Sequence, residues 1–140
     1  MPVHTRQFDI QTAGCTQVLN LTERITQAVA EGCITDGVVT LFVVGSTAAV
    51  TTTEYEPGLV NHDLKAAFEG IAPEDGVYRH EQTWNDDNGH AHVRASLVGP
   101  SLSVPLVGGQ LVLGTWQQIV LIDFDTRPRS RRIVIQVMGE

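Results

Sequence analysis

Short runs of β-branched and apolar residues, separated by glycine and proline, limit this chain to a fold built mainly from strands. Residues 38–44 (VVTLFVV) form one such run without a break, which is typical of a strand covered on both faces. A second central strand is predicted for residues 48–54, after Gly45. The sequence therefore predicts a sheet at the centre of the molecule.

Further strands are predicted on either side of these two. Residues 3–10 and 16–19 flank Gly14 and are expected to pair as a hairpin. Later strands are separated by glycine or proline and comprise residues 90–98, 101–107, 111–113, 117–124 and 132–138.

Two segments have helical spacing. Apolar residues at positions 21, 25, 28 and 29 form a stripe that ends at Gly32, and residues 59–71 carry a second stripe between Pro57 and Pro73. The predicted fold is one α+β domain over residues 1–140, rich in strand, with antiparallel sheets and two helices.

The charge balance limits the classes of molecule that the chain is expected to bind. The 16 Asp and Glu residues outnumber the 9 Lys and Arg residues, and the net charge of −7 argues against nucleic acid or an anionic membrane as the main partner. No targeting signal or membrane-length apolar run is recognised. Cys15 and Cys33 lie in no CxxC spacing, so we expect free thiols in a cytoplasmic protein.

Residues 78–92 (YRHEQTWNDDNGHAH) gather three of the 5 histidines. On the predicted strand, His90 and His92 would project from the same face because side chains alternate. Together with His80 they would offer three nitrogen ligands, which suit a borderline cation, so we predict a divalent metal site for Zn²⁺, with Mg²⁺ as the alternative. The plainer interpretation is that all three are polar strand and turn residues in solvent.

Two carboxylates are candidate catalytic groups. Asp87 would orient a ligating imidazole or a bound water, although residues 86–89 (DDNG) also form a typical turn. Glu54 ends an apolar strand, where its setting could tune it as a general base or ligand. A solvated strand end explains Glu54 equally well.

A glycine-started bend and an arginine cluster predict phosphate binding. Ser46 and Thr47 would offer hydroxyl and backbone N–H groups to an anion. Guanidinium groups fit phosphate oxygens, and the cluster contains Arg127, Arg129, Arg131 and Arg132, of which we favour Arg129 and Arg131. The alternative is that these arginines neutralise Asp123 and Asp125 or pair across a subunit boundary.

Trp116 and Gln117 form a candidate substrate contact. An indole ring can pack against an aromatic ligand while an amide fixes the polar edge of that ligand. A tryptophan in the core or in a subunit interface is the competing interpretation.

Several blocks occur in an order that resembles one known family. They are residues 45–60 (GSTAAVTTTEYEPGLV), His80, residues 84–92 (WNDDNGHAH), 99–101 (GPS), 114–118 (GTWQQ) and 127–132 (RPRSRR). Together they resemble the YjbQ-type family, often labelled secondary thiamine-phosphate synthase, over nearly the whole chain.

The resemblance implies a compact α+β fold that assembles as a homotrimer, with sites near subunit contacts and a metal-capable histidine cluster. It also implies a low thiamine-phosphate synthase activity, which some members have. This chain has Gly45 where many members carry a histidine, and Thr53 where they often carry an asparagine. Any contact that the histidine and asparagine side chains make in those members is therefore absent or replaced in this chain.

The function expected from the sequence is that of a metal-dependent enzyme acting on a small phosphorylated metabolite at the histidine cluster. One form of it is a transferase similar to thiamine-phosphate synthase. A second is a hydrolase or lyase that uses zinc-bound water, and a third is a non-catalytic trimeric module that binds a metal or metabolite.

Overall fold

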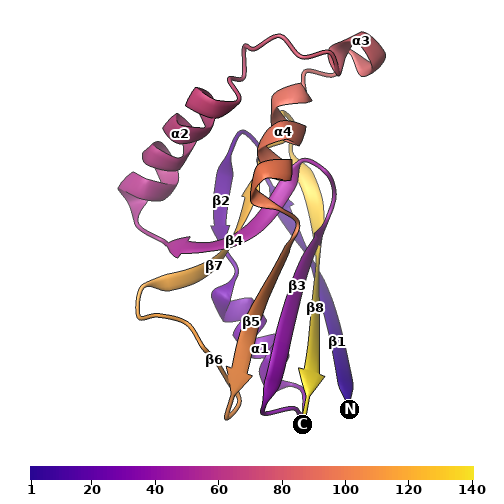
Figure 1. Ribbon diagram of the computed structural model, residues 1–140, viewed down its shortest axis with the longest axis vertical. Coiled ribbons are helices and arrows are strands. Elements are labelled where there is room, and N and C mark those ends of the chain that lie inside the picture. Colours follow the sequence, from indigo (N-terminus) through magenta and orange to yellow (C-terminus); the bar gives the residue numbers. More distant parts are fainter.

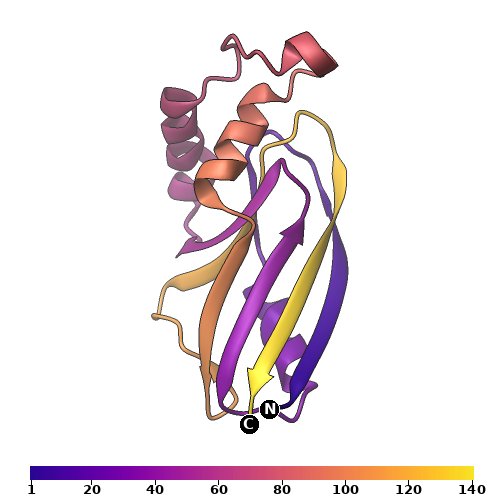
Figure 2. The same ribbon diagram turned by 45° about the vertical axis from the view of Figure 1, so that its right-hand side comes forward.

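The computed structural model describes residues 1–140 and arranges its strands as two antiparallel sheets (Figure 1). The larger sheet has the order β1 (Val3–Thr12), β8 (Arg129–Gly139), β3 (Gly37–Val44), β5 (Ser101–Val107) and β6 (Gln110–Leu111). The smaller sheet has the order β2 (Gln17–Asn20), β7 (Gln117–Asp123) and β4 (Ala48–Glu54). The two chain termini lie side by side at one end of the larger sheet (Figure 2).

The helices divide between the two ends of the molecule (Figure 1). α1 (Thr22–Ala30) lies toward the end that carries the termini. At the other end, the π-helical turn η1 (Leu59–Asp63) runs directly into α2 (Leu64–Ile71), and α3 (Glu81–Trp84) and α4 (Gly89–Val98) follow. None of these helices combines the length and the apolar character needed to cross a membrane.

The smaller sheet is a middle layer that is buried on both faces. One face of β7 presents Ile119 and Leu121 to the larger sheet and α1, in the main apolar core. The opposite face presents Val120 and Ile122 to α2 and α4, in a second core around Phe124. This arrangement confirms an α+β fold with antiparallel sheets, and it fixes α4 firmly against the middle layer.

Both predicted helices are present, as α1 and as η1 with α2, but the strand predicted over residues 90–98 is wrong, because this segment forms α4 and the short helix α3 precedes it. Ala91 and Ala95 are one helical turn apart, and both belong to the second core together with Ala49 and Val120 of the smaller sheet. Small side chains at this spacing let the helix approach the sheet closely.

The predicted pairing of the first two strands is also wrong. β1 pairs with β8, and β2 pairs with β7 in the other sheet. The chain crosses between the sheets at Gly14, Cys15 and Thr16, which all have positive φ angles, of 75°, 55° and 66°. This left-handed turn redirects the strand instead of folding it back on its neighbour.

The strand at residues 37–44 is covered on only one face within the chain. Val39, Leu41 and Val43 are buried, whereas Val38, Phe42 and Val44 are 45%, 43% and 51% exposed. The strand register places Val38 between Met138 and Pro105 on the same outward face. We call this surface of β1, β8, β3 and β5 the outer sheet face.

Candidate metal site and acidic cavity

The segment that contains the histidine cluster comprises α3, a turn and the start of α4. Asn85 and Asp87 have positive φ angles of 49° and 60°, which end α3 and start the approach to α4. The Asp86 side chain accepts a hydrogen bond from the Asn88 backbone N–H at 3.1 Å, as expected of an Asx turn. The turn predicted at residues 86–89 is therefore present, and it delivers the following histidines into a helix.

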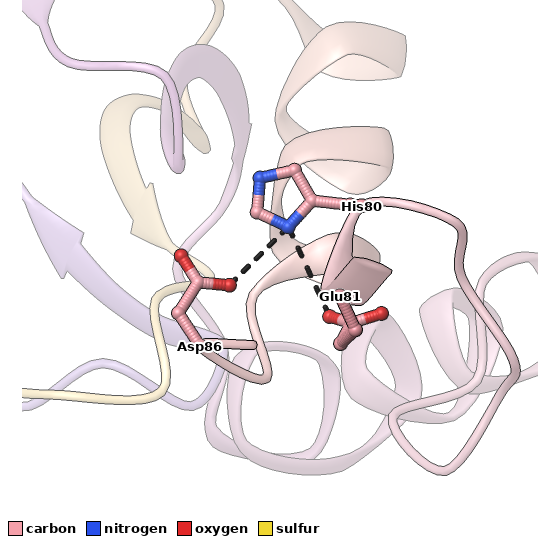
Figure 3. A group of neighbouring side chains, drawn as sticks. All are labelled: His80, Glu81 and Asp86. Atoms are coloured by element: carbon pink, nitrogen blue, oxygen red, sulfur yellow. Dashed lines mark ion pairs between the residues drawn. The ribbon is translucent and has the colours of Figure 1, made fainter. Parts of the chain in front are cut away.

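His80 lies beside two carboxylates (Figure 3). Its Nδ1 atom is 3.2 Å from Asp86 Oδ1 and 3.9 Å from Glu81 Oε1. The Nδ1 atom is buried but forms no hydrogen bond, so its closeness to Asp86 is an approach without hydrogen-bond geometry. The three residues each place one ligand atom within 4.8 Å of the others, so they form a candidate group for a shared metal ion.

His92 lies next to this group. Its ring centroid is 4.6 Å from that of His80, and its Nδ1 atom is 3.0 Å from the Ser46 carbonyl oxygen. A carbonyl oxygen only accepts hydrogen bonds, so Nδ1 must carry a proton, and in a neutral ring the lone pair is then on Nε2. Ser46 thus contributes its backbone to the cluster, by orienting His92 from the loop before β4.

His90 faces a different direction from His92. Residues two apart on a helix project about 200° apart, because each residue turns by about 100°. His90 is 2% exposed and packs near the ring of Tyr78, and burial, together with the positive charge of Arg94, lowers its pKa below the usual value for histidine. The strand geometry on which we based a shared metal face for His90 and His92 is absent, and the compact group has carboxylates in place of His90 and His92.

A cavity of about 610 Å³ adjoins the cluster on the His90 side. Asp87 lines this cavity, whereas its neighbour Asp86 reaches His80. Sequence reasoning chose Asp87 as the carboxylate beside the metal and did not single out Glu81. The signal for Glu81 was its position directly after His80.

Two of the predicted phosphate-binding residues, Thr47 and Arg131, belong to a buried ion-pair network. Arg131 holds Asp123 through two hydrogen bonds, of 2.7 Å from Nε and 3.0 Å from Nη2. Arg131 also donates to the Thr47 hydroxyl at 2.6 Å, and Thr47 donates to Asp125 at 2.8 Å. Arg129 lies 3.1 Å from Asp125. The alternative interpretation of these arginines, neutralisation of Asp123 and Asp125, therefore describes the observed contacts.

Glu54, Trp116 and Gln117 lie at the far end of β4. Glu54 pairs in register with Gln117, and Trp116 is 73% exposed beside Glu54 in a second cavity of about 470 Å³. The six residue steps from Ala48 to Glu54 span about 20 Å of strand. Within one chain, Glu54 and Trp116 are thus remote from His80.

Solved structures with the same fold define the class of protein. The chain matches a YbjQ-like protein from Sulfolobus solfataricus P2 with a TM-score of 0.87 and 30% identity, over 99% of this chain and 100% of that one. It matches a hypothetical protein from Aeropyrum pernix K1 with a TM-score of 0.90 and 31% identity, over 98% and 99%.

Sequence comparison identifies the family. The model of the UPF0047 protein YjbQ-like family matches residues 6–140, so the chain belongs to this family. A UPF0047 protein from Methanothermobacter thermautotrophicus is 33% identical over 100% of this chain and 95% of its own length. The UPF0047 protein YugU from Bacillus subtilis is 31% identical over 96% and 98%.

Proposed function

We propose that this chain is a metal-dependent enzyme that acts on a small phosphorylated metabolite, with the cation held by His80, Glu81 and Asp86. The observation that carries the proposal is the buried Nδ1 atom of His80, which has no hydrogen-bond partner yet lies within reach of two carboxylates. A buried polar nitrogen without a partner is costly, and a bound cation would remove that cost.

The distances between the donors support this assignment. Ligand atoms about 2.1 Å from one ion lie roughly 3.0–3.4 Å apart in octahedral or tetrahedral geometry. The separation of 3.2 Å between His80 and Asp86 falls in this range, and Glu81 at 3.9 Å needs only a small side-chain movement. One nitrogen and two oxygens form a harder donor set than three imidazoles, so the site suits Zn²⁺ and also accepts Mg²⁺.

His92 supports the cluster from its other side. Its Nδ1 atom donates to the Ser46 carbonyl, which leaves Nε2 of the neutral ring as the nitrogen that can bind a metal, a common way to orient a ligating histidine. A bound cation would supply a Lewis acid for a phosphate group or an acidified water. The thiamine-phosphate synthase activity implied by the family resemblance is one reaction that such a site could assist. The other is a hydrolase or lyase reaction that uses zinc-bound water.

The metal assignment is tested by replacing His80 with alanine. We expect the wild type to take up Zn²⁺ in a one-to-one ratio and the variant to bind it at least 10-fold more weakly, because a ligand is lost. Calorimetric titration and elemental analysis of the dialysed protein measure this directly. His62→Ala is the matched control, because His62 is exposed on η1 and pairs only with Asp63.

Equal Zn²⁺ affinity in the wild type and His80→Ala would refute the metal site. The same metal-loaded samples test the reaction, with a pyrimidine-methyl diphosphate and a thiazole phosphate as substrates. Failure to form thiamine phosphate with any of the metals would remove the transferase form of the proposal, and formation of the product without a metal would contradict the proposed metal dependence. We also propose a cytoplasmic location, which the two free, exposed cysteines support.

We further propose that the chain assembles as a homotrimer through the outer sheet face. That face carries Val38, Phe42 and Met138, each more than 40% exposed, while the only ion pair across it joins Asp9 and Arg132 at 3.4 Å. A second copy would cover the side of the apolar strand that the chain itself leaves open.

Replacing Phe42 with aspartate is expected to yield single chains, because a carboxylate would be buried without a partner in the interface. Light scattering coupled to size-exclusion chromatography gives the mass, which we expect to be three times that of one chain in the wild type. Val77→Asp, at a fully exposed loop position, introduces the same charge and should leave the mass unchanged. A wild-type mass equal to that of a single chain contradicts the proposal.

A further inference from the structure

The cavity of about 610 Å³ beside His90 is lined by acidic groups and by no lysine or arginine. Its carboxylates come from the loop after α2, from α3 and from the turn before α4, and they are Glu74, Asp75, Glu81 and Asp87. Carboxylates on several walls of one cavity favour a positively charged ligand. This volume is within the range of sites for small organic molecules.

A second observation is independent of the carboxylates. His90 is 2% exposed, lines the cavity, and makes no side-chain hydrogen bond to the rest of the chain. By contrast, His62 and His92 each have a partner for Nδ1. A buried imidazole with unused nitrogens points to a ligand that can donate a hydrogen bond to it.

One wall of the cavity is held rigidly. Tyr78 donates its hydroxyl proton to the Pro73 carbonyl at 2.7 Å, which leaves the ring as an apolar surface. Gly89 allows α4 to approach this ring, because a Cβ atom at position 89 would lie 2.5 Å from the Tyr78 Cβ. The Gly89 N–H also donates to Glu81 at 3.0 Å, which fixes that carboxylate at the cavity. An aromatic face beside fixed carboxylates suits an organic cation.

The carboxylates that line only this cavity are too dispersed to form a compact three-ligand metal group. The group with three ligand atoms within 4.8 Å of one another is His80, Glu81 and Asp86, and it does not contain Glu74, Asp75 or Asp87. Groups placed around a larger volume can instead contact an ammonium group and the carbon chain attached to it.

We propose that this cavity binds a small organic molecule with a primary ammonium group, which donates hydrogen bonds to Asp87 and His90 and lies against Tyr78. The site is adjacent to the cluster around His80 and shares Glu81 with it. Binding of the amine does not require the cation, so this inference and the proposed metal-dependent activity fail or succeed separately.

The experiment uses the full chain, dialysed against a chelator, and 1,4-diaminobutane as the probe. Calorimetric titration is done at about 0.15 M salt, where the Debye length of about 8 Å suppresses attraction to the overall negative charge. We expect saturable binding at one site per chain and roughly 10-fold weaker binding by Asp87→Asn, because a charged hydrogen-bond acceptor is lost. Asparagine tolerates the positive φ of 60° at this position, so the backbone turn is preserved.

Matched controls distinguish diamine binding at this cavity from nonspecific attraction to the negatively charged chain. Glu23→Gln removes one negative charge in the first turn of α1, at the opposite end of the molecule (Figure 1), and should bind the diamine as the wild type does. The neutral analogue 1,4-butanediol should not bind. Equal weakening in Glu23→Gln and Asp87→Asn, binding of the diol, or the absence of saturable diamine binding would overturn the proposal. His90→Gln, tested in the same way, should weaken diamine binding without changing the net charge at neutral pH.

Discussion

Replacing Arg131 with methionine is expected to lower the free energy of unfolding by about 3–5 kcal/mol, the cost of removing one partner from a buried ion pair. Arg131 is 6% exposed, and the carboxylate that it holds, on Asp123, is 1% exposed. Methionine fills much of the same volume but leaves this carboxylate without its bidentate donor. Urea unfolding at neutral pH, followed by circular dichroism, measures the change.

The neighbouring Arg132 provides a matched control. Arg132 is exposed and meets Asp9 at 3.4 Å on the surface, so Arg132→Met is expected to change stability by less than about 1 kcal/mol. Adding Asp123→Asn to Arg131→Met should recover part of the loss, because the buried charge is then removed. Equal effects of the two arginine substitutions would show that the network contributes little to folding.

This contrast between two adjacent arginines shows where sequence reasoning reaches its limit. The cluster at residues 127–132 indicated charge recognition, and both phosphate binding and neutralisation of Asp123 and Asp125 were consistent with it. Alternation along β8 decides between them for one residue, because Arg131 faces the interior and Arg132 faces outward. To predict which side chains of β8 point inward, one must know how β8 pairs with β1 and β3. That pairing involves residues more than 80 positions away in the sequence.

The fold was more accessible to sequence reasoning than the site was. The apolar runs that became β3, β4, β5, β7 and β8 were recognisable because buried strands favour β-branched residues. The histidine segment was not, because a spacing of two residues suggests a strand face while Ala91 and Ala95 form the packed side of a helix. His80 was predicted as a ligand, but Asp87 was chosen in place of Asp86, and the helical placement of His90 changed which groups meet at the predicted metal site.

The decrease in the free energy of unfolding at low pH should depend on Asp125. Burial alone would raise the pKa of this carboxyl, but hydrogen bonds from the Arg127 backbone N–H, the Thr47 hydroxyl and the Arg129 guanidinium outweigh it and lower the pKa below its ordinary value. The folded state therefore binds the proton more weakly than the unfolded chain, in which an aspartate has a pKa of about 4. Its contribution to stability is complete above that value and is lost as pH falls through the folded pKa.

Asp125→Asn is expected to cost about 2 kcal/mol at neutral pH, because charge-assisted hydrogen bonds become ordinary ones. The difference in unfolding free energy between the wild type and the variant should stay constant down to about pH 4 and then shrink, since only the wild type loses this carboxylate by protonation. Urea titrations at a series of pH values test the trend, and carboxyl ¹³C shifts locate the folded pKa. A difference that remains the same through the acid range would mean that Asp125 is not the group whose protonation weakens the buried network.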